Sequence, residues 1–102
     1  MKLIKICSAA GVECPENADF SVTGFAIDNR KVAPGTVFGA FQGAQANGED
    51  FIPAAIEAGA IAIVARPEAK VDGALHIASP TPRKCFAEMA AQFFTPVPEH
   101  IV

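Results

Sequence analysis

The chain has 102 residues, of which 51% are hydrophobic and 19% are charged, and its formal net charge at pH 7 is −3. This length and composition suit a single domain with one modest core, and they exclude an intrinsically disordered chain. The acidic balance and the lack of any Lys/Arg run argue against a nucleic-acid-binding surface. An acidic domain can still bind an anionic nucleotide locally, through backbone N–H groups and a single Arg.

The first ten residues predict a helix. Leu3, Ile6, Cys7 and Ala10 follow the spacing of one helix face, and Gly11 is a suitable stop. A short first strand is the alternative. The apolar stretch is too short and too interrupted for a secretory signal or a membrane span, so we expect a cytoplasmic protein with no membrane partner.

Two short strands and a turn are predicted next. Residues 20–27 alternate in polarity, and Gly24 marks either a bulge or a close approach of backbones. In the turn at residues 32–35, Pro34 fixes the first central residue and Gly35 takes the second. Residues 37–41 carry few polar atoms, so we expect a strand buried on both faces.

Residues 49–58 predict a helix, because Pro53 is tolerated in a first turn and Gly59 ends the pattern. A short apolar strand follows at residues 60–64. A helix, a glycine and a strand at this spacing form half of an α/β crossover. We expect the helix to bury an apolar stripe of Phe51, Ala55 and Ala58, with Ile52 and Ile56 beside it.

The last third of the chain repeats the alternation of strand and helix. A polar segment at residues 66–73 precedes a strand at 74–78, and Thr81-Pro82 begins a helix that runs to about residue 94. The fold class is therefore α/β, with a small mixed β-sheet of about four to five short strands and flanking helices. The helix is expected to bury Cys85, Phe86, Met89, Ala90 and Phe93.

No catalytic or metal-binding constellation is found. The three cysteines, Cys7, Cys14 and Cys85, are irregularly spaced, and no C-x-x-C pair exists. Cys7 and Cys85 fall on apolar helix faces, so core packing is favoured over a nucleophilic role, although a thiol enzyme using Cys14 or Cys85 stays an alternative. We therefore expect no catalytic residue, no metal and no cofactor in this chain.

Two segments instead suggest a binding site. Asp28, Asn29 and Arg30 end a predicted strand, where ligand contacts of α/β sheets gather, and an Asn amide suits the imide edge of uracil. The structural alternative is an Asx-type turn. Residues 43–48 form a small-residue loop before a helix, which suits a phosphate; the alternative is an ordinary connector with a helix cap.

Residues 23–64 resemble the N-terminal domain of the Mur ligases, the ligases of peptidoglycan stem-peptide synthesis. The family pattern is a strand ending in Asp-Ser-Arg or Asp-Thr-Arg, a Pro-Gly turn, an aromatic in an apolar strand, a Gly-x-x-x-Asp-Gly loop and a helix beginning near Phe-Ile. Here these become Asp28-Asn29-Arg30, Pro34-Gly35, Phe38, residues 43–48 and Phe51-Ile52. The similarity is greatest to the ligases that add the third residue, diaminopimelate or lysine.

The resemblance implies a UDP-binding domain at residues 1–95, followed at 96–102 by a linker and the start of a central ATP-binding domain. Two residues depart from the family pattern: Asn29 replaces Ser or Thr, and Asn47 replaces Asp. The positions that match UDP contacts of the family are Ile27, Asn29, Ala44, Gln45 and Ala46, with Asp28, Arg30, Gly43 and Asn47 as possible support.

The resemblance also implies that this chain is a piece of an ATP-dependent ligase. The parent would use ATP and Mg²⁺ to phosphorylate the D-glutamate carboxylate of UDP-N-acetylmuramoyl-L-Ala-D-Glu, and the added amino acid would attack the acyl phosphate. This domain would anchor UDP and pack on the missing central domain. The alternatives are the same domain of the ligase that adds D-Ala-D-Ala, which the loop at 43–48 disfavours, and a non-catalytic α/β interaction module.

Overall fold

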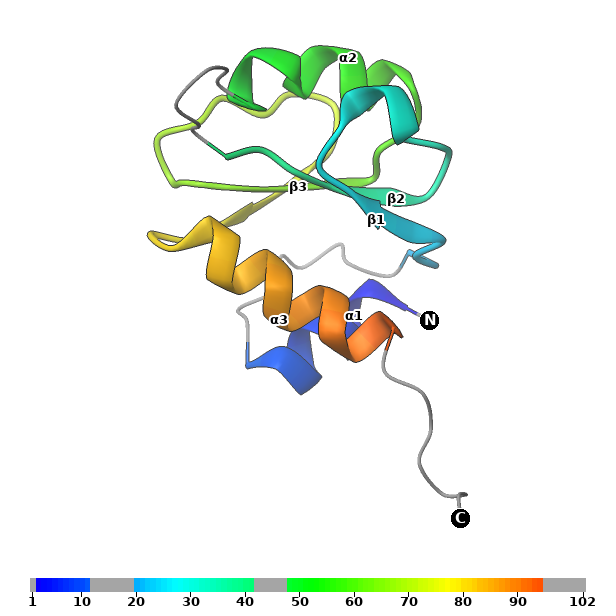
Figure 1. Ribbon diagram of the computed structural model, residues 1–102, viewed down its shortest axis with the longest axis vertical. Helices are drawn as coiled ribbons and strands as arrows, with labels where there is room; N and C mark the ends of the chain where they lie inside the picture. Colours follow the sequence, from blue (N-terminus) through cyan, green and yellow to red (C-terminus); the bar gives the residue numbers. More distant parts are fainter. Residues whose placement is uncertain (1, 12–19, 42–47, 95–102) are drawn as a thin grey trace.

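The computed structural model describes residues 2–11, 20–41 and 48–94 (Figure 1). The predicted linker and the last short strand, at residues 95–102, lie outside these ranges, as does Cys14. The elements, with η for a 3-10 helix, are α1 (Leu3–Ala10), β1 (Gly24–Ala26), η1 (Asn29–Lys31), β2 (Thr36–Gly39), η2 (Gly48–Phe51), α2 (Ile52–Glu57), β3 (Ala62–Ala65), β4 (Leu75–Ala78) and α3 (Pro82–Phe94).

The four described strands form one sheet in the order β1-β2-β3-β4. All three pairings are parallel; for example, Phe38 of β2 lies opposite Ala26 of β1 and Ile63 of β3. The α/β class is confirmed, but the expected mixed sheet is wrong among these strands. Each connection crosses over the sheet and re-enters at the same end, which makes neighbouring strands parallel.

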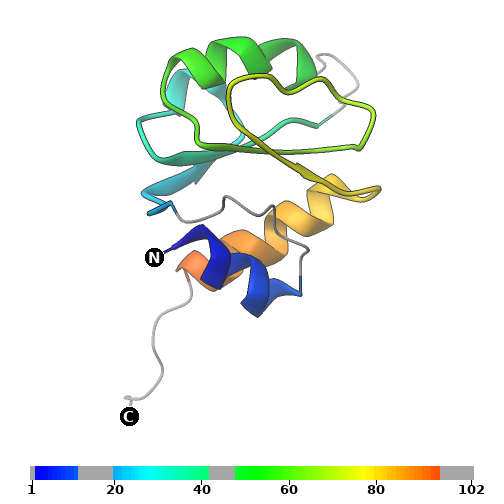
Figure 2. The ribbon, with the colours of Figure 1, turned by 180° about the vertical axis from the view of Figure 1, so that it is seen from behind.

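Helices cover both faces of the sheet (Figures 1 and 2). One face carries α2 and η1, and the other carries α1 and α3. Side chains alternate along each strand, so Val37 packs toward α1 and α3 while Phe38 packs toward α2. This alternation explains why all four residues of β2 and of β3 are buried. Burial on both faces was predicted for the strand at residues 37–41, and residues 37–40 are buried.

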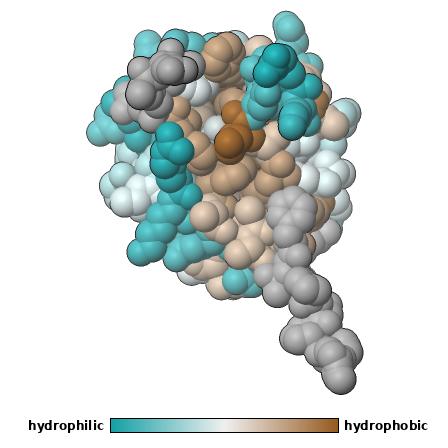
Figure 3. All heavy atoms as spheres, viewed as in Figure 1, coloured by the Kyte–Doolittle hydropathy of each residue, from teal (hydrophilic) through white to brown (hydrophobic). Residues whose placement is uncertain are grey.

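A row of phenylalanines lies along the seam between the sheet and α3. The ring of Phe25 contacts those of Phe86 and Phe93, each at 5.4 Å between centroids, and Phe86 meets Phe41 edge-on at 5.4 Å. These rings are half-buried. In the view of Figure 3, an apolar area lies in the middle of the molecule between hydrophilic areas.

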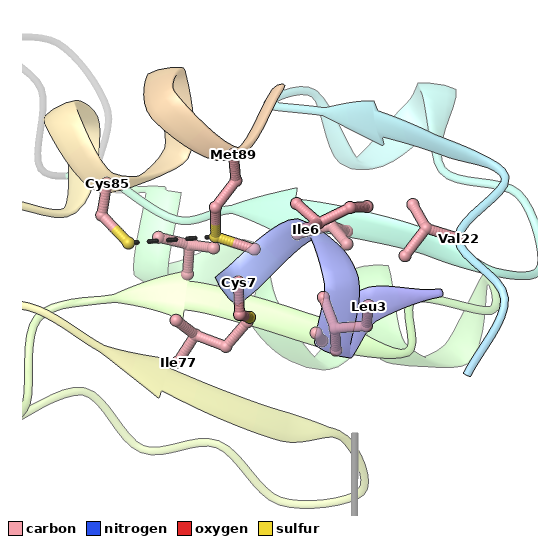
Figure 4. Close-up of a cluster of buried hydrophobic side chains, with 10 residues drawn as sticks. Leu3, Ile6, Cys7, Val22, Ile77, Cys85 and Met89 are labelled. Atoms are coloured by element: carbon pink, nitrogen blue, oxygen red, sulfur yellow. Dashed lines mark hydrogen bonds between the residues drawn. The ribbon is translucent and has the colours of Figure 1, made fainter. Parts of the chain in front are cut away.

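The core between the sheet and the helices α1 and α3 is built from aliphatic and sulfur-containing side chains (Figure 4). The Sγ of Cys85 donates to the Sδ of Met89 across 3.9 Å, within one face of α3. Burial raises the pKa of the Cys85 thiol, so little of the nucleophilic thiolate forms at neutral pH. The predicted packing roles of Cys7 and Cys85 are confirmed, because both are buried in this core.

Glycine positions differ in part from expectation. The turn at Gly35 is confirmed by its φ of 89°. The close approach expected at Gly24 is wrong, because nothing lies within 4 Å of a Cβ built there. The close approach is instead at Gly59, where a Cβ would lie 2.6 Å from the Cα of Pro34. The carbonyl of Gly59 accepts a hydrogen bond from the Gly35 N–H at 3.0 Å, which brings the two backbones together.

The helix expected at residues 49–58 is split into η2 and α2. The stripe expected to bury Phe51 and Ala58 is wrong: Ile52 and Ala55 are buried, whereas Phe51 is 41% exposed and Ala58 is exposed. The tighter 3-10 turn changes the direction of the side chains before α2 begins. Phe51 therefore points away from the core, at the start of the helix.

Candidate binding site

Because the strands are parallel, their C-terminal ends lie at one edge of the sheet, here called the carboxyl edge. Ile27 follows β1, Ala40 follows β2, Arg66 follows β3 and Ser79 follows β4. This edge is where ligands bind in open α/β sheets. The hollows at the end of β1 and at the ends of β2, β3 and β4 use different residues, and a further one, lined by Ala78 and Ser79 among others, lies beside the end of β4.

The first hollow, the β1-end pocket, has a volume of about 570 Å³ and is lined by Ile27, Asp28, Asn29, Arg30 and Phe51. Two sequence-predicted contacts, Ile27 and Asn29, and two predicted supporting residues, Asp28 and Arg30, therefore do lie together. Phe51 was missed by sequence reasoning, which placed it in the core. The available signal was Pro53, since a proline in the first turn of α2 leaves Phe51 before the helix.

Hydrogen bonds between Asp28 and Arg30 fix the backbone that follows β1. One carboxylate oxygen of Asp28, Oδ1, accepts from the backbone N of Arg30 at 2.9 Å and from its Nε at 3.1 Å, and Oδ2 accepts from Nη2 at 2.9 Å. These bonds from Arg30 lower the pKa of Asp28 to about 2. The Asx-type turn is thus present at Asp28, which caps η1. The cap holds Asn29 in the first position of η1, facing the pocket.

The walls of the β1-end pocket suit a flat, neutral ring. Ile27 is 63% exposed and Phe51 is 41% exposed, so both present apolar surface to the hollow. The half-buried Asn29 offers an amide that can donate and accept hydrogen bonds. Arg30 is paired with Asp28 while its side chain is 84% exposed. An aromatic face, an aliphatic side chain and one amide are the parts needed to bind a nucleobase.

The other predicted contacts, Ala44, Gln45 and Ala46, lie outside the described residues, as do Gly43 and Asn47. The residues that flank this segment are described. The N–H of Gly48 donates to the carbonyl of Phe41 at 2.7 Å. A Cβ on Gly48 would lie 2.7 Å from the Phe41 nitrogen, so glycine is required for this contact. Phe41 and Gly48, which flank the segment, therefore contact each other at the carboxyl edge. The 3-10 helix η2 begins at Gly48 and ends at Phe51, which lines the β1-end pocket.

The second hollow, the basic cavity, has a volume of about 390 Å³ and lies at the ends of β2, β3 and β4. Glu49 accepts from Nε and Nη2 of Arg66 at 2.6 and 3.2 Å. The guanidinium of Arg83 lies 5.0 Å from the ring centre of Phe41. The sequence did not predict this cavity. Its lining residues are Ala40, Phe41, Glu49, Arg66, Pro80, Thr81, Pro82, Arg83 and Lys84.

In the part of the chain that the structure describes, no three His, Cys, Asp or Glu side chains gather as they would around a metal ion. No helix in the same residues combines the length and apolar character that crossing a membrane requires.

Comparison with known proteins shows similarity to the Mur ligase family. A model of the Mur ligase family, described as its catalytic domain, matches residues 21–95. The chain is similar to three proteins named UDP-N-acetylmuramoyl-L-alanyl-D-glutamate--2,6-diaminopimelate ligase. It is 58% identical to that of Zymomonas mobilis subsp. mobilis, over 95% of this chain and 20% of the relative. It is 38% identical to that of Vibrio parahaemolyticus, over 82% of this chain and 19% of the relative. It is 41% identical to that of Bradyrhizobium diazoefficiens, over 85% of this chain and 18% of the relative.

Proposed function

The chain belongs to the Mur ligase family, and from this premise we propose that it anchors the UDP group of the substrate in a ligase of peptidoglycan synthesis. The chain spans about a fifth of the length of the curated relatives it matches, 20% for that of Zymomonas mobilis. The proposed division is a UDP-binding domain at residues 1–95 and a linker from residue 96 to a central ATP-binding domain.

The observation that carries the proposal is the β1-end pocket itself. Ile27 and Asn29 match family positions for UDP contacts, and both line one hollow at the end of β1. Phe51 adds an aromatic wall that the sequence pattern had not indicated. A uracil ring stacked on Phe51, with its imide edge against the Asn29 amide, uses each of these groups.

The proposed role is positioning rather than chemistry. Held by its UDP end, the substrate UDP-N-acetylmuramoyl-L-Ala-D-Glu would present its D-glutamate carboxylate to residues beyond this chain, where ATP and Mg²⁺ would act. Ala44, Gln45 and Ala46 are proposed to complete the UDP contacts, with Gly43 and Asn47 in support. The cytoplasm, where ATP and nucleotide sugars are available, is the proposed compartment.

The names of the relatives favour one ligase over another. The relatives described above are named for the ligase that adds 2,6-diaminopimelate, which supports a third-residue ligase rather than the D-Ala-D-Ala-adding enzyme. A non-catalytic interaction module is the other alternative. Binding of UDP separates it from the proposal, because such a module has no nucleotide ligand.

The direct test is an amide NMR titration of the chain with UDP up to millimolar concentration. We expect the resonances of Ile27, Asn29 and Phe51 to shift in a saturable manner. A well-folded protein whose spectrum does not change with UDP, or with the complete UDP-N-acetylmuramoyl-dipeptide, would overturn the proposal. Shifts confined to residues far from the carboxyl edge would overturn the site.

The variant Asn29→Ala tests the proposed contact between the Asn29 amide and UDP. Loss of its amide should weaken UDP binding by about 1–2 kcal/mol, the scale of a lost hydrogen bond in a binding site. The control is Lys31→Ala, since Lys31 is an exposed residue of the same 3-10 helix that does not line the pocket. Equal dissociation constants for Asn29→Ala and the unmodified chain would remove Asn29 from the site.

A further inference from the structure

We propose that Asn29 binds the base in the β1-end pocket through an amide that rotates by half a turn, so that the pocket accepts uracil and cytosine with similar affinity. This inference rests on the proposed function, because it takes a nucleobase to lie in this pocket. It names the class of base as a pyrimidine with either hydrogen-bonding edge. Discrimination between UDP and CDP would then have no cause in this pocket.

The backbone of Asn29 is fixed, whereas its side-chain amide is not. Asn29 is the first residue of η1, and its backbone carbonyl accepts a hydrogen bond from the N–H of Val32 at 3.3 Å. Within residues 2–11, 20–41 and 48–94, no group hydrogen-bonds the amide itself. The terminal torsion of an Asn side chain is broad and roughly two-fold, and half a turn exchanges the positions of oxygen and nitrogen.

Uracil and cytosine present opposite edges to such an amide. Uracil has a donor at N3 and an acceptor at O4, whereas cytosine has an acceptor at N3 and a donor at N4. In one orientation, Oδ1 of Asn29 accepts from the uracil N3–H while Nδ2 donates to O4. After half a turn, Nδ2 donates to the cytosine N3 while Oδ1 accepts from its N4–H. Each base therefore makes two hydrogen bonds with the same side chain.

The other described side chains of the pocket do not separate the two bases. Ile27 and Phe51 are 63% and 41% exposed, and they offer apolar surface to a pyrimidine ring, which has the same size in both. Asp28 accepts from Arg30 through both carboxylate oxygens, at 2.9 and 3.1 Å for Oδ1 and 2.9 Å for Oδ2. A guanidinium only donates, and the carbonyl O2 that would accept from it is common to both bases.

An amide held in one orientation would behave differently. A fixed bidentate pair discriminates against the wrong base by roughly five- to a hundredfold, because the wrong base sets donor against donor and acceptor against acceptor. Asn29 is half-buried, and no described neighbour imposes one orientation on its amide. The ratio of the two affinities therefore measures whether the amide rotates.

The experiment titrates the chain with UDP, with CDP and with the UDP analogue that is methylated at N3. All three ligands have the same sugar and diphosphate, so only the base differs. Each is added to the unmodified chain, to Asn29→Ala and to the control Lys31→Ala, with amide NMR as the readout. Lys31 is an exposed residue of the same 3-10 helix that does not line the pocket.

We expect UDP and CDP to bind the unmodified chain with dissociation constants that differ by less than about fivefold, the lower limit for a fixed pair. The methylated analogue should bind at least about fivefold more weakly than UDP, since it has lost the N3–H donor. Asn29→Ala should weaken UDP and CDP by the same factor, roughly five- to thirtyfold. Lys31→Ala should weaken neither.

A preference of about fivefold or more for UDP or for CDP would overturn the proposal, and so would a loss in Asn29→Ala that is confined to one of them. These outcomes differ from failure of the proposed function. If UDP shifts Ile27, Asn29 and Phe51 but CDP binds much more weakly, the proposed function stands and the rotating amide is wrong. If neither nucleotide shifts these resonances, the proposed function fails and this inference fails with it.

Discussion

The β1-end pocket and the basic cavity lie at the same carboxyl edge of the sheet but differ in the contacts of their charged side chains. In the β1-end pocket, Asp28 accepts three hydrogen bonds from Arg30, and these two are the charged residues among the described lining. Glu49 of the basic cavity instead pairs with Arg66, while Arg83 lies over the ring of Phe41. The two hollows therefore hold their charged side chains by different contacts.

The two hollows also differ in how they are assembled. Asp28 and Arg30 are two residues apart in sequence, so the end of β1 is fixed by local contacts. Glu49 and Arg66 are 17 residues apart, and their ion pair depends on the crossover from α2 to β3. The β1-end pocket should therefore tolerate changes elsewhere in the fold better than the basic cavity does.

Gly48→Ala should have the largest effect, and it should remove the difference between the hollows by damaging both. A Cβ at Gly48 would lie 2.7 Å from the nitrogen and 2.8 Å from the oxygen of Phe41. Backbone atoms must then move, so we expect the free energy of unfolding to fall by about 1–3 kcal/mol. Binding of uridine should weaken. Chemical denaturation and the NMR titrations measure these changes.

The control for this variant is Gly24→Ala, because nothing lies within 4 Å of a Cβ built at Gly24. Its stability should stay within about 0.5 kcal/mol of the unmodified chain. If Gly48→Ala were as stable as Gly24→Ala and bound uridine normally, the Gly48–Phe41 contact would have no role in the β1-end pocket.

Phe51→Ala should have the next largest effect, and it should act on the β1-end pocket, because Phe51 does not line the basic cavity. Loss of an aromatic face that stacks on a base costs about 1–3 kcal/mol of binding, so uridine and UDP should bind at least several-fold more weakly. The control is Phe20→Ala, since Phe20 is equally exposed, at 41%, and lies outside both hollows. Equal uridine affinity in the two variants would contradict stacking on Phe51.

Much of the fold follows from local sequence patterns. The apolar spacing of α1, the Pro-Gly turn at Gly35 and the proline at the start of α3 each depend on neighbouring residues, and each matches the structure. Strand direction does not have a local cause. Apolar runs of four residues, such as β2 and β3, pair equally well in either direction, so crossovers decided by the whole chain make the sheet parallel.

The same distinction between local sequence patterns and contacts decided by the whole chain applies to the candidate site. Asp28, Asn29 and Arg30 were predictable because a strand end is visible in sequence. The basic cavity was not predictable, because Arg66 and Arg83 come together only when the ends of β2, β3 and β4 converge. Phe51 was misplaced for a different reason. Its apolar spacing fits a helix face, but the 3-10 turn of η2 takes it out of the helix.

The smallest expected effect concerns Asp28, and it tests whether the charge of Arg30 is neutralised. The hydrogen bonds from Arg30 lower the pKa of Asp28 from 3.8 to about 2. A pKa that is depressed in the folded state gives a stabilisation that is present above the unfolded pKa and is lost as the pH falls through the folded one. Here that window runs from pH 3.8 down to about pH 2.

Arg30→Gln should return the pKa of Asp28 toward 3.8, and stability should then no longer depend on Asp28 in this window. A carboxyl-detected NMR titration follows the group directly. A pKa of Asp28 that stays near 2 in Arg30→Gln would mean that the hydrogen bonds from Arg30 are not what lowers it.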